Sequence, residues 1–276
     1  MLCSAAVKTL QDRIALVTGA SRGIGTYIAR SIASRGATVV AVARDRGGLA
    51  ETCAAIEADG GKAVALDADL SDVAALSRLV DRAEAACGPV DILVNNAGVE
   101  WYRRYHDYTA EQLRAVLTVN LHTPMELARI LLPKMITRGR GHIVNIASLA
   151  GKKGVLYNAP YSASKAGLIL WTDALRQELK DSPIGVSVIM PGYIREAGMF
   201  HDDGVEPPRV LGTSSPQDVA DAVVDAIEHR RAEIIVNPGP MRPMLALGQL
   251  VPGLADRIVD WMGVNRLNEA RRRDPE

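Results

Sequence analysis

The chain has 276 residues and a formal net charge of zero, with 32 basic and 32 acidic residues mixed along its length. This balance gives no electrostatic case for nucleic-acid binding. Nearly half of the residues are hydrophobic but only one is Phe, so small aliphatic side chains must build the core. Such a core suits helices packed on a sheet that is buried on both faces. The length is sufficient for one large domain.

Cysteines, histidines and the first residues of the chain limit the cellular context. Cys3, Cys53 and Cys87 are odd in number and lack the spacing of metal ligands, so a reduced, cytoplasmic protein is the simplest interpretation. The opening segment MLCSAAVKTLQD is too short and polar for a signal peptide, and no apolar run approaches the roughly 20 residues of a membrane span. The histidines form no HExxH or similar motif, so no metal site is expected.

Short β-branched runs alternate with longer amphipathic stretches along the chain. Apolar strands separated by helices predict βαβ units, and therefore a single doubly wound, Rossmann-type α/β domain with a parallel sheet of about seven strands flanked by helices. The expected strands are 13–18, 38–43, 63–67, 91–95, 141–148, 185–191 and 233–237. The expected helices are 24–35, 46–58, 72–87, 109–138, 160–181 and 215–230.

Two segments lie outside this alternation. Residues 196–214 contain Gly and Pro without a helical period, and a loop of this length inside a compact domain is usually functional, so we interpret it as a lid. Residues 238–276 form a C-terminal extension of the domain expected over 1–237. Its apolar residues recur at three- and four-residue steps, which indicates helices with a break at Pro252-Gly253. The recurring residues are Leu247, Leu250, Leu254, Ile258 and Trp261.

The apolar face of this extension is expected to pack on its own domain or on a partner subunit. The alternative is a helix that lies on a membrane surface, because Trp261 accompanies Arg257, Arg266 and the ARRR of 270–273. Acidic residues such as Asp256 dilute that positive charge, which weakens the alternative.

The first expected strand leads directly into the sequence TGASRGIG. Gly19, Gly23 and Gly25 lack a Cβ atom, so backbone N–H groups of this turn can approach a phosphate at the positive end of the following helix. A merely flexible strand–helix turn is the alternative. Because the glycines follow the first strand of an alternating α/β pattern, they favour a dinucleotide site.

The end of the second expected strand indicates which dinucleotide binds. A carboxylate there hydrogen-bonds the ribose of NAD, whereas an arginine receives the 2′-phosphate of NADP. The sequence AVARDR places Arg44 directly after Ala43, and Arg22 in the glycine loop can add a second positive charge. Asp45 could turn inward instead, and both arginines could be ordinary surface charges. NADP is the favoured cofactor, and NAD is the alternative.

The stretch YNAPYSASKAG spaces Tyr157, Tyr161 and Lys165 four residues apart. A free tyrosine has a pKa near 10, and a protonated lysine one helical turn away favours the phenolate and lowers that pKa. Tyr161 has such a partner in Lys165, whereas Tyr157 does not. Pro160 suits the first turn of a helix, which leaves Tyr157 in the preceding loop as a wall of the cleft or a packing residue.

Taken together, these motifs resemble those of the short-chain dehydrogenase/reductase family. The resemblance covers roughly residues 12–237, and it implies a catalytic domain over 1–237 that binds the dinucleotide. The implied activity is hydride transfer between NADP(H) and a carbonyl or secondary alcohol. The motifs that occur in the family's order are TGASRGIG, NNAG (95–98), Asn120 in VNL, Ser148, YSASK (161–165) and PG (191–192).

The resemblance also implies a role for individual residues. Tyr161 is the acid or base, and Lys165 in addition holds the nicotinamide ribose. Ser148 polarises the substrate oxygen, and Asn120 supports a proton relay through water. Asp69 and Leu70 match the family's contacts with the adenine ring. The full set of implied cofactor contacts is Gly19, Ser21, Arg22, Gly23, Ile24, Gly25, Arg44, Asp69, Leu70, Asn96, Ala97, Gly98, Tyr161, Lys165, Pro191, Gly192 and Ile194.

One position departs from the family pattern. The family commonly has a threonine after PG that hydrogen-bonds the nicotinamide carboxamide, but PGYIREAGM has Glu196 there. Glu196 could face solvent, pair with Arg195 or reach the lid, while the backbone of Ile194 can still meet the carboxamide. The aromatic segment EWYRRYHDY (100–108) could line the substrate mouth or pack as a surface loop.

A non-catalytic NADP-binding regulatory or scaffold protein on the same fold is the alternative function. Such a protein would need no proton relay, so the set of Asn120, Ser148, Tyr161 and Lys165 argues against it. The substrate is expected to be a small carbonyl or alcohol compound; the expected lid contains both apolar and acidic residues, which is compatible with many ketones, steroids or acyl chains. The family pairs its long helices across a two-fold axis, which implies a homodimer or homotetramer through 109–138 and 160–181.

Overall fold

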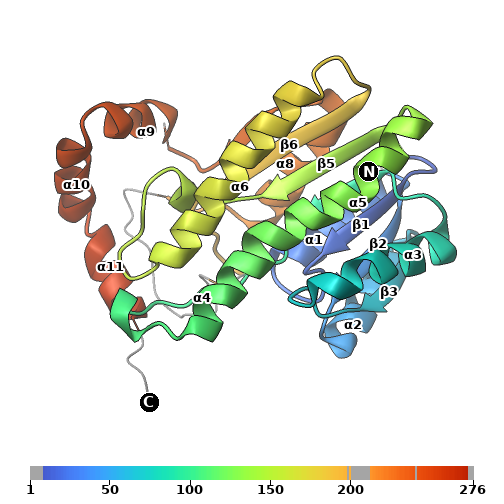
Figure 1. The fold of residues 1–276 in the computed structure, drawn as a ribbon, viewed down its shortest axis with the longest axis horizontal. Helices are drawn as coiled ribbons and strands as arrows, with labels where there is room; N and C mark the ends of the chain where they lie inside the picture. The colour runs from blue at the N-terminus through green and yellow to red at the C-terminus, as the bar shows by residue number, and fades with distance from the viewer. Residues whose placement is uncertain (1–8, 198, 200–211, 240, 273–276) are drawn as a thin grey trace, which may run out of the picture.

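One parallel sheet forms the centre of the protein. The computed structural model describes residues 9–197, 199, 212–239 and 241–272, and within them seven strands lie in the order β3-β2-β1-β4-β5-β6-β7 (Figure 1). This confirms the predicted doubly wound α/β fold. The strands are β1 (Ile14–Thr18), β2 (Thr38–Ala43), β3 (Lys62–Asp67), β4 (Ile92–Asn95), β5 (Gly141–Ile146), β6 (Ile184–Pro191) and β7 (Glu233–Val236).

Helices cover both faces of this sheet. They are α1 (Ile24–Ser34), α2 (Arg46–Ala58), α3 (Leu76–Cys87), α4 (Ala110–Leu117), α5 (Thr123–Arg138), α6 (Ala159–Glu178), α8 (Pro216–His229), α9 (Met241–Leu250), α10 (Pro252–Trp261) and α11 (Val264–Arg271). The helices α1, α2 and α8 share one buried cluster with the sheet, whereas α3 and α5 share another.

Alternation along each strand divides the core between the two faces. Successive strand residues point to opposite sides of a sheet. Val17 therefore joins the cluster that contains Ile28 of α1 and Val223 of α8, whereas its neighbour Leu16 joins the cluster that contains Leu131 of α5. All five side chains are fully buried. The apolar strands inferred from the sequence are thus buried on both faces.

Several elements differ from the predicted ones, mostly by one to three residues at an end. The helix expected from residue 72 begins at Leu76 after a 3₁₀ turn over Val73–Ala75. The strand expected to reach residue 148 ends at Ile146, because Ser148 instead caps a short 3₁₀ helix by accepting a hydrogen bond from the Ala150 N–H. The long helix expected over 109–138 contains a π-helical turn, Thr118–His122, between α4 and α5.

Part of the expected lid and part of the tail lie outside the described residues, including residues 198, 200–211 and 273–276. Within the described tail, α9 ends at Leu250 and α10 begins at Pro252, where the sequence indicates a break. The three helices α9–α11 leave the sheet after β7 and curve back toward the loop that precedes α6 (Figure 1). Among the helices described, none is long and apolar enough to cross a membrane.

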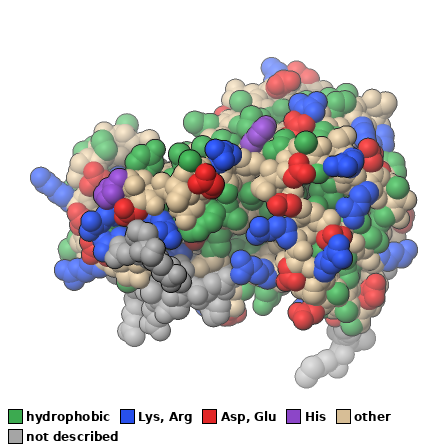
Figure 2. Space-filling view, turned by 60° about the horizontal axis from the view of Figure 1, so that its bottom comes forward, with side chains coloured by type: hydrophobic (Ala, Val, Ile, Leu, Met, Phe, Trp, Pro, Cys, Tyr) green, Lys and Arg blue, Asp and Glu red, His purple; other side chains and the backbone are tan. Residues whose placement is uncertain are grey.

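The surface carries mixed charge. In the view of Figure 2, basic and acidic side chains lie close together over the right-hand part of the molecule. Many of these charges are paired, for example Arg30 with Asp59 at 2.8 Å and Arg46 with Asp67 at 2.8 Å. This agrees with the balanced composition and with the absence of an electrostatic case for nucleic acid.

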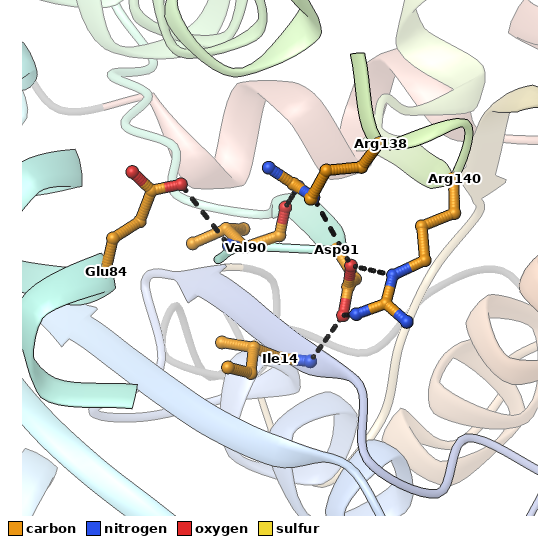
Figure 3. Close-up of polar contacts among 6 residues, drawn as sticks. All are labelled: Ile14, Glu84, Val90, Asp91, Arg138 and Arg140. Carbon is orange, nitrogen blue, oxygen red and sulfur yellow. Dashed lines mark hydrogen bonds and ion pairs between the residues drawn. The ribbon is translucent and has the colours of Figure 1, made fainter. Parts of the chain in front are cut away.

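A buried carboxylate joins several elements at the amino-terminal edge of the sheet (Figure 3). Asp91, directly before β4, is only 1% exposed. It accepts hydrogen bonds from the Ile14 N–H of β1 at 3.3 Å and from Arg140 before β5 at 2.8 and 3.2 Å, and Arg138 lies 3.9 Å away. Asp91 thus links the start of β1 to the segment between α5 and β5.

We expect Asp91→Asn to lower the free energy of unfolding by about 1–3 kcal/mol, because it removes the charge that these buried donors satisfy. Urea denaturation measures this change. Asp59→Asn is the matched control, since its exposed pair with Arg30 should contribute less than about 1 kcal/mol. Activity per folded molecule should not change, because Asp91 lies at the amino-terminal edge of the sheet, opposite the candidate active site described in the next section. Equal stability of the Asp91→Asn and Asp59→Asn variants would contradict the prediction.

Candidate active site

The carboxyl ends of β1 and β4 form a crevice where the strand order reverses. Ligands of doubly wound sheets bind at this kind of switch point. Thr18 at the end of β1 donates a hydrogen bond to the Val94 carbonyl at 3.2 Å and accepts from the N–H groups of Asn96 and Ala97 at 3.0 and 3.1 Å. The Asn96 amide donates back to the Thr18 and Gly19 carbonyls. The NNAG segment and the glycine loop are therefore held together.

The glycine loop fits a dinucleotide pyrophosphate. Gly19 has a φ of 68°, and a Cβ there would lie 2.8 Å from Ala97 Cα. A Cβ at Gly25 would lie 2.0 Å from the Gly19 carbonyl oxygen, so only glycine permits this close packing. The first turn of α1 has no capping side chain and no acidic residue. Its N–H groups are thus suited to a phosphate at the positive end of the helix.

The groups at the end of β2 also suit a phosphate. Arg44 is exposed and lies directly after the strand. Asp45 does not turn inward: its carboxylate caps α2 by accepting a hydrogen bond from the Gly47 N–H at 3.0 Å. Arg46 pairs with Asp67, and Arg22 is exposed on the glycine loop. The carboxylate that could have selected a ribose hydroxyl is therefore engaged in capping a helix.

The expected adenine contacts lie just after β3. The Asp69 carboxylate accepts hydrogen bonds from the Ser71 N–H and hydroxyl at 2.9 and 2.8 Å, and these bonds lower the pKa of Asp69. Leu70 is buried, and its carbonyl accepts a hydrogen bond from Thr123 at 2.6 Å. Both residues are thus fixed at the carboxyl edge of the sheet, where β2 separates β3 from β1, the strand that leads into the glycine loop.

Tyr161, Lys165 and Ser148 come together in one buried cavity of about 270 Å³. Tyr161 and Lys165 lie one turn apart on α6, with the ammonium group 5.6 Å from the centre of the phenol ring. The Lys165 ammonium donates a hydrogen bond to the Ile146 carbonyl at the end of β5 at 2.7 Å. Ser148, two residues beyond that strand, is a hydrogen-bonding neighbour of the Tyr161 phenol.

The expected lowering of the Tyr161 pKa is not found. Burial raises the pKa of this phenol well above its ordinary value, and the negative charge of Glu100 raises it further. The hydrogen bond with Ser148 and the charge of Arg271 act in the opposite direction but are weaker. Burial also lowers the pKa of Lys165 to about 8. Because its pKa is raised, the Tyr161 phenol keeps its proton. Tyr161 is therefore suited to donate a proton to a substrate.

Asn120 lies in the π-helical turn between α4 and α5 and is fully buried. Its amide exchanges two hydrogen bonds with the backbone of Val99, at 2.8 and 2.9 Å, and donates a third to the Ser164 hydroxyl at 3.2 Å. A Cβ at Gly98 would lie 3.4 Å from the Asn120 carbonyl oxygen and 3.8 Å from the Lys165 ammonium. Asn120 thus joins the NNAG segment to α6 beside the lysine. Turns of this kind are frequent at functional sites.

The segment after β6 supplies one wall of the cavity. Pro191, Gly192 and Ile194 line it, and Ile194 forms a bridge with Ser214. Glu196 does not line the cavity; it is exposed, has a φ of 72° and accepts a hydrogen bond from Arg195 at 2.7 Å. Of the three alternatives for Glu196, two are seen together among the described residues: its side chain faces solvent and pairs with Arg195.

Tyr157 is separated from the catalytic tyrosine candidate. It has a φ of 63° and lies in the loop before α6, which begins at Ala159. The guanidinium of Arg272 lies 5.2 Å from the centre of its ring, and its carbonyl accepts a hydrogen bond from the Arg103 N–H. Tyr157 is absent from the cavity wall, so of the two roles considered it has the packing one.

Two residues of the aromatic segment 100–108, Glu100 and Tyr102, line the cavity together with Arg271 of the C-terminal extension, so part of that segment does lie at the cavity. Arg271 of α11 is buried and pairs with Glu100 at 3.0 Å, while its guanidinium lies 3.9 Å from the centre of the Tyr102 ring and donates a hydrogen bond to the Tyr102 hydroxyl. Asn158 donates to the other oxygen of Glu100 at 2.7 Å. Arg271 belongs to the ARRR that suggested a membrane surface, but it points inward. The clustering of arginines near the end of the chain did not indicate that one of them, Arg271, would be buried.

Comparisons with known proteins agree with this geometry. The family model for short chain dehydrogenases matches residues 13–205. The chain is 49% identical over 268 residues to a protein of Nostoc sp. named ketoacyl reductase HetN, a match that covers 95% of this chain and 93% of the relative. The chain therefore belongs to the short-chain dehydrogenase/reductase family of oxidoreductases.

Two solved structures of the family show which cofactors its members hold. A metagenomic short-chain oxidoreductase in complex with NADP is 38% identical, with a TM-score of 0.73 over 84% of this chain and 99% of that one. A short-chain dehydrogenase/reductase of Burkholderia phymatum in complex with NAD is 27% identical, with a TM-score of 0.78 over 89% of this chain and 96% of that one. These neighbours support a nicotinamide dinucleotide as the cofactor.

Proposed function

We propose that this protein is an NADP-dependent reductase of ketones in which Tyr161 is the proton donor. The observation that carries the proposal is the convergence of Tyr161, Ser148 and Lys165 in one cavity that continues to the NNAG segment and to the glycine-loop helix. When bound, NADPH supplies the hydride. The chain's own groups position the ketone and provide the proton.

We propose a role for each of these groups. A ketone oxygen placed near the phenol accepts the Tyr161 proton and a hydrogen bond from the Ser148 hydroxyl. The C=O bond becomes an alcohol C–OH as the carbonyl carbon receives the hydride. The cationic form of Lys165 stabilises the phenolate that the proton transfer leaves behind. Asn120 holds the backbone at the end of the NNAG segment in place beside Lys165. This position is in accord with a relay through water that returns a proton to the site.

A ketoacyl compound is the substrate class we propose. The support is the likeness to the protein named ketoacyl reductase, which extends over 95% of this chain. The cavity is compatible with this class, because the larger part of its wall is apolar. We further propose a catalytic domain over 1–237 and a C-terminal extension over 238–276.

A homodimer or homotetramer built through α4–α5 and α6 is part of the proposal. Large apolar side chains of these helices are exposed in the single chain, among them Leu170 at 72%, Leu117 at 39% and Met125 at 36%. Burying them against a second copy would remove apolar surface from water. Sedimentation velocity tests the state, and a monomer at working concentration would contradict it.

Tyr161→Phe should lower kcat for ketone reduction by about 100- to 10 000-fold, because it removes the acid while leaving the ring in place. NADPH affinity, measured by fluorescence titration, should change little. Tyr105→Phe is the control, since Tyr105 is largely exposed and should keep full activity. A Tyr161→Phe enzyme that keeps most of its activity would rule out this proton donor.

The pH profile should report Lys165. Its pKa of about 8 means that the ammonium form dominates below pH 8 and is lost above it. Because kcat/KM follows ionisations of the free enzyme, kcat/KM for reduction should fall about tenfold per pH unit above roughly pH 8. Rates measured from pH 6 to 10 with NADPH below saturation test this, and a flat profile between pH 7 and 9.5 would refute it.

Arg44→Ala should weaken NADPH binding by about 10- to 100-fold, because it removes one hydrogen-bonded charge pair with the 2′-phosphate. The affinity for NADH, which lacks this phosphate, should stay within about twofold of that of the unmutated protein. Fluorescence titration of both nucleotides measures the effect. Arg46→Ala is the matched control two residues away, because Arg46 is already paired with Asp67. Equal affinity of the unmutated protein for NADPH and NADH would overturn the proposed preference.

A further inference from the structure

The three C-terminal helices build a wall of the catalytic cavity. Residues of α9 and α10 and the turn after them line the cavity that contains Tyr161 and Ser148. Most of these side chains are apolar, among them Met244, Leu245, Ile258, Val259 and Met262. Flexible methionines adapt to irregular apolar shapes. This wall is suited to the hydrocarbon part of a substrate whose ketone lies at Tyr161.

A few polar side chains interrupt this wall, and most of them are engaged elsewhere. The Gln249 amide donates a hydrogen bond to the Lys152 carbonyl at 2.9 Å. The Asn265 amide donates to Asp260 of α10. Arg271 pairs with Glu100. These polar groups hold the helices in place.

Asn268 on α11 differs from them. It lines the same cavity and is only 1% exposed, yet neither its amide nitrogen nor its amide oxygen has a hydrogen-bond partner among the described residues. A buried polar group without a partner is costly, so each such group in a native protein calls for an explanation. Its place on the wall of the catalytic cavity offers one, because Asn268 borders the space in which a substrate would lie.

The helix that carries Asn268 is held firmly against the catalytic side. Arg271, three residues along α11, is paired with Glu100, two residues beyond the NNAG segment, and packs on the Tyr102 ring. The next residue, Arg272, packs on the ring of Tyr157 before α6. Contacts on two sides therefore fix the position of Asn268 relative to Tyr161. Such fixed positioning is what a recognition residue requires.

We propose that Asn268 determines substrate specificity: its amide N–H donates a hydrogen bond to a second oxygen of the substrate while the ketone oxygen lies at Tyr161 and Ser148. A ketoacyl compound carries such a second oxygen in its acyl carbonyl, and its chain lies along the methionine-containing wall. This inference rests on the proposed reductase function and names the group that distinguishes a ketoacyl compound from a simple ketone.

The test compares two NADPH-dependent substrates of equal chain length, ethyl 3-oxohexanoate and 4-nonanone. Asn268→Leu should lower kcat/KM for the ester by about 10- to 100-fold and leave that for the ketone within about threefold, since only the ester has the second oxygen. The ester is intrinsically more reactive, so the readout is the change in the ratio of the two values between variant and parent. A decrease that is equal for both substrates, or no decrease, overturns the proposal.

Asn265→Leu is the matched control, because it makes the same chemical change one turn away at an amide that already donates to Asp260. It should alter both substrates alike. Thermal unfolding should show that Asn268→Leu is at least as stable as the parent, because it removes an unpaired buried amide. If Asn268→Leu does not fold, Asn268→Ala, which also removes the amide, is measured in the same way.

Binding separates this inference from the proposed function. In the Tyr161→Phe background with NADP present, calorimetry of ethyl 3-oxohexanoate requires no turnover. Asn268→Leu should weaken this binding at least tenfold. If the parent reduces neither substrate but the binding loss is observed, the reductase function fails and the role of Asn268 stands. If the parent reduces both and binding is unaffected by the substitution, the role of Asn268 fails and the reductase function stands.

Discussion

The hydrogen bonds between the ends of β1 and β4 are the interaction on which the site depends. Thr18 and Asn96 are far apart in sequence, yet the Thr18 hydroxyl at the end of β1 bonds to the end of β4 and to the Asn96 N–H, and the Asn96 amide returns bonds to the Thr18 and Gly19 carbonyls. Parallel strands present all their carboxyl ends at one edge, and the reversal of strand order opens a crevice there. The pyrophosphate loop, the NNAG segment and the end of β5 therefore meet in one place.

Burial controls the chemistry in this crevice. The Tyr161 phenol and the Lys165 ammonium are both removed from water, which favours the uncharged form of each. The phenol therefore keeps its proton, while the lysine titrates close to neutral pH. The expectation that the lysine would lower the tyrosine pKa considered only the charge one turn away. It omitted the larger cost of burying a phenolate away from water, and it omitted the negative charge of Glu100.

The C-terminal helices add an apolar wall to the crevice. The ion pair of Arg271 with Glu100 is buried, and a buried pair costs desolvation that good geometry and added hydrogen bonds must offset. Here the Tyr102 ring and Asn158 supply those added contacts. The same helices also expose Leu250 and Trp261, at 80% and 81%, and neither side chain lines the cavity. One face of this segment thus serves the site while the other remains accessible.

Local sequence determined the fold class, the glycine loop and the pairing of Tyr161 with Lys165, because each depends on residues within one strand–turn–helix unit or one helical turn. It also separated Tyr157 from them, since Pro160 requires α6 to begin nearby. Tertiary structure decided the ionisation of Tyr161 and the inward direction of Arg271. These depend on burial and on partners such as Glu100, which lies 171 residues from Arg271 in the chain. No spacing along the sequence encodes such a contact, because it forms only when the sheet edge and the last helix meet.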